Sequence, residues 1–207
     1  FPVVSRPQGP RRSGVGDPAA TPRENLLLAS LPEPEYTRVA AALQCHELPP
    51  GDAARATFSR GEHLHFLGRG LVSVVRGGND RPALGVALVG CEGAIGLGLL
   101  THAAADSSRS IEPHTAVRSW SLPAAVARRE FARGGRFQRN LLRFGHALLE
   151  QVVTTTVCRS RHAVDDQLRA WLLQALARLS APEIPVTQEV VARMLGVRRA
   201  SVSEALA

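Results

Sequence analysis

The pattern of hydrophobic and polar positions changes period twice along the 207-residue chain. Apolar residues recur with a helical period before Cys45, alternate with polar residues from there to Leu122, and return to a helical period after Pro123. The middle region consists of short apolar runs, such as 63–67 and 83–89, separated by turns rich in glycine, proline and aspartate. Short strands at this spacing are typical of an all-β sandwich or barrel. The sequence therefore predicts an α+β chain in which helices flank an N-terminal β-roll.

The first twenty residues show no apolar period and contain four prolines, three glycines and the pair Arg11-Arg12. This composition is typical of a disordered arm. The run Thr21-Pro22-Arg23-Glu24 has the spacing of a capping box at a helix N-terminus, with proline at the first helical position. We therefore expect a basic arm over residues 1–23 and folded structure from there on.

The longest uninterrupted helical pattern runs from Phe137 to Arg159, about 35 Å at 1.5 Å per residue. Small and apolar side chains recur along it, and Leu142 and Leu149 widen the stripe that they form. Such a stripe fits either a helix buried within one chain or a seam between two subunits. Because the helix joins two compositionally different regions, we predict a homodimer through it. The predicted seam consists of Leu141, Gly145, Leu148, Val152 and Thr155.

Residues 187–207 carry the spacing of a helix-turn-helix. Thr187 is suited to cap a two-turn helix, and Gly196 stands where that helix ends and a positive φ is favoured. A second helix follows almost at once, and Ala192 is small where two steeply crossing helices would collide. The spacing of Ala192, Gly196 and Val202 predicts a helix-turn-helix. The alternative is an ordinary two-helix corner with a solvated arginine pair.

In a helix-turn-helix the start of the second helix faces the major groove of DNA. Arginine is the usual reader of guanine edges, and glutamate accepts a hydrogen bond from cytosine. Hydroxyl and amide groups at a helix N-terminus suit a phosphate. The candidate DNA-binding residues are therefore Thr187, Gln188, Arg198, Arg199, Ser201, Ser203 and Glu204.

Charge is distributed unevenly along the chain, whose net charge is +7 and whose basic residues are all arginine. Residues 1–23 carry four arginines against one acid, residues 24–135 carry eleven against eleven, and residues 136–207 carry ten against six. The absence of lysine is best explained by genome composition. Genome composition does not explain why the positive charge lies in the two end regions of the chain. A neutral middle joined to a basic end indicates contact with an anion, most simply nucleic acid.

Several other classes of protein are disfavoured. The three cysteines are far apart and form no CxxC pair, which favours a reducing cytoplasm and excludes a disulfide scaffold. No apolar run approaches the roughly 20 residues of a membrane span. His63 and His65 share one face of a predicted strand, but no third metal ligand is evident. No spacing typical of a catalytic triad or of paired carboxylates is present. We therefore predict no enzyme, no metal and no cofactor.

Taken with the predicted roll and long helix, two runs of residues resemble the cyclic-AMP receptor protein / fumarate-nitrate regulator (CRP/FNR) family of bacterial transcription regulators. The first is Leu-Arg-Ala-Trp-Leu-Leu at 168–173, and the second is the helix-turn-helix itself. The run Val-Gly-Cys-Glu-Gly-Ala-Ile-Gly at 89–96 is similar to a Val-Gly-x-Glu-Gly run of one branch of the family. The resemblance covers roughly residues 24–207.

The resemblance implies a cyclic-nucleotide-binding-like jelly roll, a homodimer through the long helix and a winged helix that binds DNA. It also implies that Arg199 reads bases, and that Thr187, Gln188 and Ser201 hold phosphates. Cyclic-nucleotide binders of the family have glutamate after a glycine where this chain has Leu97 after Gly96. Their Arg-Ser/Thr-Ala run is matched only by Arg109-Ser110-Ile111, slightly too far along. The oxygen sensors' N-terminal cysteine cluster has no counterpart, and the family's β-hairpin wing would follow Ala207, the last residue of the chain.

The predicted organisation is a basic arm (1–23), a β-roll sensor (24–135), a dimerisation helix (136–159) and a truncated helix-turn-helix domain (160–207). The predicted function is a transcription regulator that binds a two-fold operator in double-stranded DNA as a homodimer. RNA polymerase and an unidentified small-molecule effector acting through the roll are further candidate partners. The alternative is a ligand-sensing or interaction module whose DNA-binding end is vestigial or truncated.

Overall fold

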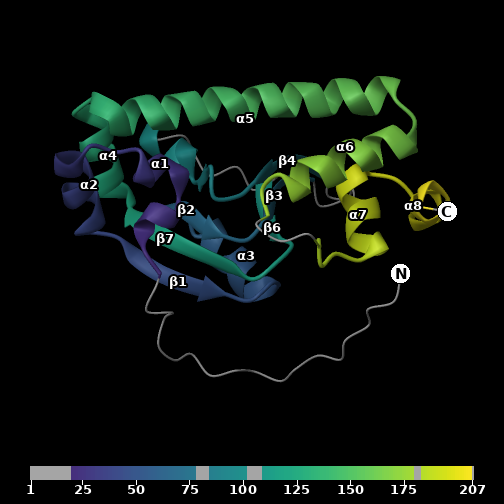
Figure 1. Cartoon of the computed structure of the whole chain (residues 1–207), viewed down its shortest axis with the longest axis horizontal. Coiled ribbons are helices and arrows are strands. Elements are labelled where there is room, and N and C mark those ends of the chain that lie inside the picture. Colours follow the sequence, from purple (N-terminus) through teal and green to yellow (C-terminus); the bar gives the residue numbers. More distant parts are fainter. Residues whose placement is uncertain (1–19, 78–83, 102–108, 180–182, 207) are drawn as a thin grey trace.

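The computed structural model describes residues 20–77, 84–101, 109–179 and 183–206, so the predicted arm lies almost wholly outside the described residues. Helices come before, within and after the strands (Figure 1). In chain order the elements are η1 (Pro22–Glu24), α1 (Leu26–Ala29), α2 (Glu33–Ala40), β1 (Gln44–Leu48), α3 (Asp52–Ser59), β2 (His63–Arg69), β3 (Val72–Arg76), β4 (Leu84–Val89), β5 (Ala94–Ile95), η2 (Leu97–Thr101), β6 (Arg109–Pro113), β7 (Val117–Pro123), α4 (Ala124–Ala132), α5 (Gly135–Arg161), α6 (Val164–Leu176), α7 (Gln188–Leu195) and α8 (Arg199–Ala205).

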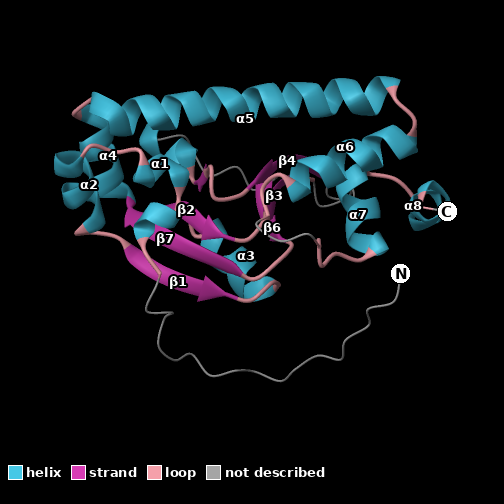
Figure 2. Cartoon of the chain, viewed as in Figure 1, coloured by secondary structure: helices cyan, strands magenta, loops and turns pink. Residues whose placement is uncertain are grey.

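The strands of the described residues form two antiparallel sheets, which confirms the predicted β-roll (Figure 2). One sheet has the order β1-β7-β2-β5, and the other has the order β4-β3-β6. In the first sheet Phe66 lies opposite Trp120, and in the second Val74 lies opposite Ile111. Phe66, Trp120 and Ile111 are buried in one hydrophobic core, which Val74 contacts from its edge. Alternation along the strands thus turns one apolar face of each sheet toward the other, as the period of two predicts.

One helix lies where the sequence predicted only strands and turns. Helix α3 (Asp52–Ser59) interrupts the strand region and buries Ala54 and Phe58, four residues apart on one face. Alanine is the best helix former, and Asp52 places an acid in the first turn. A helix of eight residues has too few turns for its period to be recognised among alternating strands. The hydrophobic pattern therefore did not predict this helix.

The start of the folded region lies close to the predicted position, but the predicted capping box does not form. The Thr21 hydroxyl accepts from the N–H of Arg23 at 3.4 Å, and the N–H of Glu24 donates to the Thr21 backbone oxygen at 3.0 Å. The Glu24 carboxylate pairs with Arg118 of β7 at 2.7 Å instead of reaching back to Thr21. A tertiary ion pair has therefore replaced the local bond. The side chain of Asn25 accepts from the N–H of Leu28 and so caps α1.

Helix α5 runs along the whole length of the molecule, over the β-roll at one end and over α6 and α7 at the other (Figure 1). Its N-cap, Gly134, has no side chain to satisfy the first amides. The Glu35 carboxylate on α2 accepts from the N–H groups of Arg136 and Phe137 at 3.1 and 2.8 Å. Burial raises the pKa of Glu35, but these two hydrogen bonds, together with the charges of Arg38 and Arg139, outweigh it and the net pKa is lowered. A residue about a hundred positions away therefore fixes where the longest helix begins.

The C-terminal helices share a second hydrophobic core with the roll. Trp171 of α6 and Met194 of α7 are buried against Leu88 and Val75 of the three-stranded sheet. A Cβ atom on Gly85 of β4 would lie 2.9 Å from the Met194 sulfur, so this glycine permits the close approach of α7. This second core contains residues from both sides of the boundary that the sequence places at residue 135. The domain boundaries inferred from sequence remain predictions. Among the described residues no helix is long and apolar enough to cross a membrane.

Candidate nucleic-acid interface

The first helix of the predicted helix-turn-helix is α7, and Thr187 caps it as the sequence predicts. The Thr187 hydroxyl accepts from the N–H of Val190 at 3.2 Å. A hydroxyl that accepts through its oxygen keeps its hydrogen as a donor, which suits a phosphate oxygen. Val191, Met194 and Leu195 are buried and form the inner face of the helix.

The turn between the two helices depends on Gly196. This residue adopts the left-handed conformation with φ 72° and ψ 31°, and its N–H bonds to the last turn of α7. The N–H of Val197 then donates to the carbonyl of Ala192 at 3.0 Å, so two residues suffice to reach the next cap at Arg198. Ala192 is 3% exposed and Val202 is fully buried, which places both at the helix crossing as their spacing predicts.

Helix α8 presents charged side chains at its start. Arg198 is the N-cap, Arg199 is the first helical residue, and both are exposed. Glu204 is exposed near the end of the same helix. Two arginines at a free helix N-terminus place positive charge on a solvent-facing edge, which is the arrangement that a DNA phosphate or base edge requires.

The other predicted DNA-binding residues lie around the same edge. The Ser203 hydroxyl donates to the side-chain oxygen of Gln188 at 2.8 Å, which joins α8 to the first turn of α7. Ser201 is partly buried in the first turn of α8. All seven predicted residues therefore lie on α7, α8 or their caps, and Gln188 and Ser203 form a pair that the sequence did not indicate.

Two ion pairs that the sequence did not predict hold the C-terminal helices against the roll. Arg193 of α7 bonds Glu112 of β6 at 2.7 Å, and the same carboxylate bonds Arg55 of α3 at 2.8 Å. Arg178, just after α6, bonds Glu92 at 2.7 Å. These partners are 81 and 86 residues apart in the chain, so no local pattern could reveal them.

The structure overturns the residues predicted for the subunit seam. Leu141 is 2% exposed and belongs to the core of its own β-roll, and Leu148 packs against that core. A Cβ atom on Gly145 would lie 3.8 Å from the Leu97 side chain of the roll. Thr155 lines a cavity against β4, and Val152 is only partly exposed between these two faces. The predicted seam therefore mostly faces its own chain.

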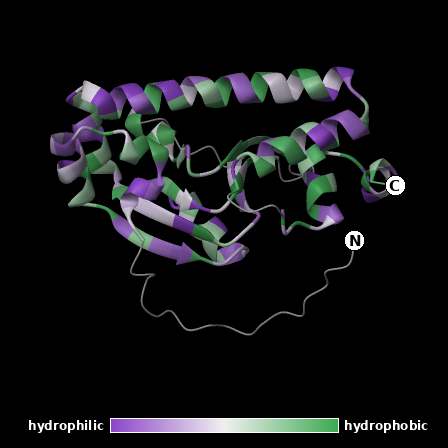
Figure 3. Cartoon of the chain, viewed as in Figure 1, coloured by the Kyte–Doolittle hydropathy of each residue, from purple (hydrophilic) through white to green (hydrophobic). Residues whose placement is uncertain are grey.

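A different stripe of α5 faces solvent. Leu142, Leu149, Val153 and Val157 are 57%, 58%, 50% and 48% exposed. Their spacing of seven, four and four keeps them on one side of the helix, and Leu142 and Leu149 lie about 100° around it from their neighbours Leu141 and Leu148. Figure 3 shows hydrophobic and hydrophilic residues alternating along the whole length of α5. The stripe is present in the sequence as the leucine pairs 141–142 and 148–149. The sequence alone does not determine which leucine of each pair faces inward.

Two positions that the resemblance connects with cyclic-nucleotide binding, Leu97 and Ile111, carry apolar side chains. Leu97, at the start of η2, is partly buried against the roll core and lies beside Gly145 of α5. Ile111 of β6 is 6% exposed, and Ser110 before it is exposed. A leucine side chain cannot accept a hydrogen bond from a ribose hydroxyl. We propose no effector-binding residue in this region.

The two histidines singled out by sequence lie beside a third. The rings of His63 and His65 are 6.2 Å apart, and His46 of β1 lies 6.3 Å from His65. His65 bonds Ser119 at 3.2 Å, and burial, followed by the charges of His46 and His63, lowers its pKa to about 4. Among the described residues no group of three or more histidine, cysteine or acidic side chains could hold a metal ion.

Comparison with known proteins gives a likeness of fold. No family model matches the chain, and no curated protein matches it by sequence. A solved structure from Eubacterium rectale, described as a transcriptional regulator of the crp/fnr family, is 13% identical with a TM-score of 0.67, over 89% of this chain and 86% of that one. The regulator CLP from Xanthomonas campestris, described as responsive to c-di-GMP, is 16% identical with a TM-score of 0.65, over 84% and 90%.

A third solved structure, FixK2 from Bradyrhizobium japonicum, is 15% identical with a TM-score of 0.61, over 79% of this chain and 81% of that one. These neighbours include transcriptional regulators of the CRP/FNR family, at low sequence identity. The predicted fold class is therefore confirmed as an α+β fold with a cyclic-nucleotide-binding-like β-roll, shared with regulators of that family.

Proposed function

We propose that the chain is a cytoplasmic transcription regulator, not an enzyme, that binds a two-fold site in double-stranded DNA as a homodimer. The observation that carries the proposal is the α7–Gly196–α8 unit, with Arg198 and Arg199 exposed at the start of the second helix. The likeness of fold to known regulators supports it, as does the excess of arginine in residues 136–207.

Arg199 is proposed to read a base and Arg198 to assist it, with Ser203 and Glu204 on the same helix as further base contacts. Thr187 and Gln188, at the N-terminus of α7, and Ser201 are proposed to hold phosphates. A phosphate contact fixes the position of the protein without carrying sequence information, whereas a bidentate arginine contact discriminates between bases. The two groups of residues therefore differ in what their removal does.

The homodimer is proposed to form through the exposed stripe of α5, Leu142, Leu149, Val153 and Val157, which replaces the seam predicted from sequence. The occupant is a second copy of this chain, because two α8 helices at a fixed spacing match a two-fold site only when both subunits are joined rigidly. The repeat of seven between Leu142 and Leu149 is that of a helix pairing with a copy of itself. Half of each of these side chains is already buried by the chain itself, and pairing would cover the remainder.

The test is binding of the 207-residue protein to a selected DNA duplex, measured by fluorescence anisotropy at several salt concentrations. We expect log K to fall linearly with log salt, because each neutralised phosphate releases counterions. Arg199→Ala should cost about 1–3 kcal/mol on the selected site and relax one base position in each half-site. Thr187→Val should weaken binding equally on all sequences.

Arg169→Ala is the matched control, because Arg169 is 73% exposed on α6, is not one of the residues proposed to contact DNA, and should not affect binding. If Arg199→Ala weakened the selected and a scrambled duplex equally, Arg199 would be a phosphate contact. An affinity that did not respond to salt would contradict DNA binding itself. It would favour the alternative of a sensor with a vestigial DNA-binding end, for which the cavity described below is the supporting observation.

A further inference from the structure

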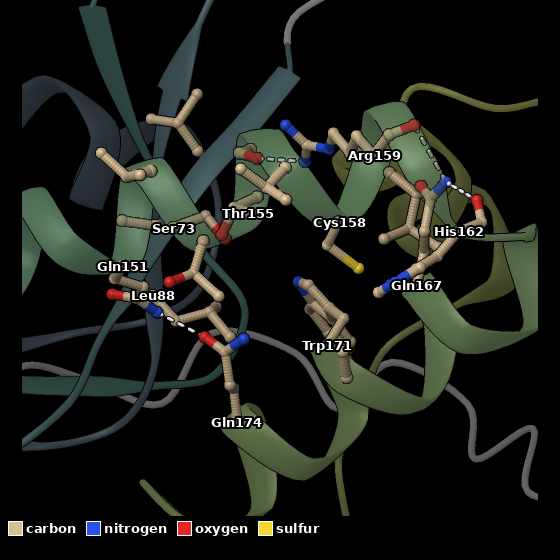
Figure 4. A pocket seen from close by; sticks show the side chains of 18 of the residues that line it. Ser73, Leu88, Gln151, Thr155, Cys158, Arg159, His162, Gln167, Trp171 and Gln174 are labelled. Carbon is tan, nitrogen blue, oxygen red and sulfur yellow. Dashed lines mark hydrogen bonds between the residues drawn. The ribbon is translucent and has the colours of Figure 1, made fainter.

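A cavity of about 450 Å³ lies between the edge strand β4, the C-terminal part of α5 and the helix α6 (Figure 4). Apolar side chains form much of its wall, among them Val86, Leu88, Val157 and Trp171. Cavities of this size and character are the usual sites of small organic molecules. Leu97, which stands where cyclic-nucleotide binders of the family have glutamate, is not among the residues that line it.

One wall of the cavity is held in place by a pair of amides. Gln151 of α5 and Gln174 of α6 lie with their side-chain amides 2.6 Å apart. In the opposite orientation of its amide, Gln151 instead accepts from the N–H of Leu88 at 3.1 Å and donates to the C=O of Leu88 at 3.0 Å. This contact occupies the free hydrogen-bonding edge of β4. The cavity is therefore bounded by elements tied to one another, and it is not a gap left by loose packing.

Arg159 is the one arginine that lines the cavity, and its charge is not balanced. One terminal nitrogen, Nη2, donates to the carbonyl oxygen of Gly85 on β4 and, at 2.7 Å, to that of Met194 at the end of α7. The Nε atom is buried without a hydrogen-bond partner among the described residues. No carboxylate of the described residues lies within ion-pair distance of it. Burial lowers the pKa of Arg159, as expected for a cation with too few partners.

The acid that shares the cavity does not supply the missing countercharge. Asp166 of α6 also lines it, but that residue is exposed and its carboxylate pairs with Arg169 at 3.3 Å. His162, at the end of α5, is exposed as well. A buried guanidinium N–H without an acceptor is costly, and the cost is removed by an oxyanion that reaches it.

We propose that this cavity binds a small organic anion with an apolar body, whose oxyanion is held by Arg159 while its body lies against Trp171, Leu88 and Val86. The Nε and Nη2 atoms of a guanidinium form one edge of its fork, which matches the two oxygens of a carboxylate. A neutral apolar molecule would leave the Nε–H unsatisfied, and a cation would be repelled. The cavity therefore selects for negative charge as well as for apolar surface.

The position of Arg159 gives binding a structural consequence. Both bonds of Nη2 go to elements that pack directly against each other, β4 of the roll and α7 of the helix-turn-helix. An oxyanion on the Nε/Nη2 edge competes with one of these carbonyls, so that occupancy of the cavity alters how α7 is fixed to the roll. This consequence rests on the function proposed above, whereas binding itself does not. The test below uses no DNA, so either can fail alone.

The experiment titrates the intact protein with two dyes that differ by one charge. 8-Anilinonaphthalene-1-sulfonate is an aromatic anion, and N-phenyl-1-naphthylamine has the same ring system without the sulfonate. We expect one sulfonate dye per chain, bound at least about tenfold more tightly than the neutral dye. Arg159→Gln should weaken the sulfonate dye by about tenfold or more and change the neutral dye by less than about twofold. Arg161→Gln, an exposed arginine two positions away, should leave both dyes unchanged.

A second variant tests whether the dye binds in the cavity and leaves Arg159 unchanged. Ala170→Phe puts a ring into the cavity from α6 and should weaken both dyes by about tenfold or more, whether or not Arg159→Gln folds. Equal affinity of the wild-type protein for the two dyes would overturn the proposal, as would unchanged sulfonate binding in a folded Arg159→Gln protein. Binding that survives Ala170→Phe would place the dye outside the cavity and would also overturn the proposal.

Discussion

Leu141 and Leu142 are neighbours on α5, and the structure predicts that replacing them has opposite consequences. Leu141 is 2% exposed in the roll core, whereas Leu142 is 57% exposed on the stripe proposed to pair two subunits. Leu141→Ala should therefore destabilise the fold, and Leu142→Ala should weaken the dimer.

The sizes follow from the exposed fractions. Fully burying a leucine is worth about 1.5–3 kcal/mol, so covering the 57% of Leu142 that is exposed is worth roughly 0.9–1.7 kcal/mol in each subunit. Two copies contribute to every dimer, which gives roughly 1.7–3.4 kcal/mol and a rise in the dimer Kd of about 20- to 300-fold. A buried Leu→Ala change instead costs about 2–5 kcal/mol of folding free energy.

Sedimentation equilibrium over a range of protein concentrations measures the dimer Kd, and urea unfolding at one fixed high concentration measures stability. We expect Leu142→Ala to change the first strongly, and Leu141→Ala to lower the second by the larger amount. The fixed concentration matters, because dissociation of a dimer lowers apparent stability by mass action. An unchanged dimer Kd in Leu142→Ala would refute the assignment of the stripe. A Leu141→Ala protein of unchanged stability that no longer dimerises would restore the seam first predicted from sequence.

Three further predictions concern pH, the interhelical turn and nucleotide binding. His65 and His114 are buried and neutral, and burial is the main cause that lowers the pKa of each from 6.5 to about 4. As the pH falls below 6.5, these histidines therefore take up protons in the unfolded chain before they do so in the folded protein. Each should cost about 2 kcal/mol of stability between pH 7.5 and pH 5, measured by urea unfolding, and His65→Gln should flatten that dependence. Gly196→Ala should lower the thermal midpoint, with a cost of about 1 kcal/mol or more, because φ is positive there and the new Cβ would lie 2.5 Å from Leu84; an unchanged midpoint would count against the turn geometry. Cyclic AMP should show no micromolar binding by calorimetry, because Leu97 cannot accept a bond from the ribose hydroxyl and an unmatched buried hydroxyl costs about 1–3 kcal/mol; a micromolar Kd would contradict this.

The sequence predicted most of what local spacing determines. The period of two gave the roll, and the spacing of Ala192, Gly196 and Val202 gave the helix-turn-helix with its cap at Thr187, because both patterns repeat over neighbouring residues. The short helix α3 was missed because eight residues hold too few repeats.

What depends on distant partners was not predictable. Leu141 and Leu142 are chemically identical, and only the position of the roll decides which of them is buried. The same holds for Glu35, whose role is to cap α5 from another helix, and for Arg159, which bonds two carbonyls from different elements. A single sequence contains no signal for these pairings.

The central claim is that α7 and α8 read a two-fold DNA site. Selection of duplexes bound by the 207-residue protein from a fully random library tests it most directly, because it assumes no operator. We predict enrichment of an inverted repeat whose half-sites are centred about one helical turn, or a multiple of it, apart, and loss of the preference at one position of each half-site when Arg199→Ala is selected in parallel. Enrichment of no sequence, or the same sequence preference in both selections, would contradict the account.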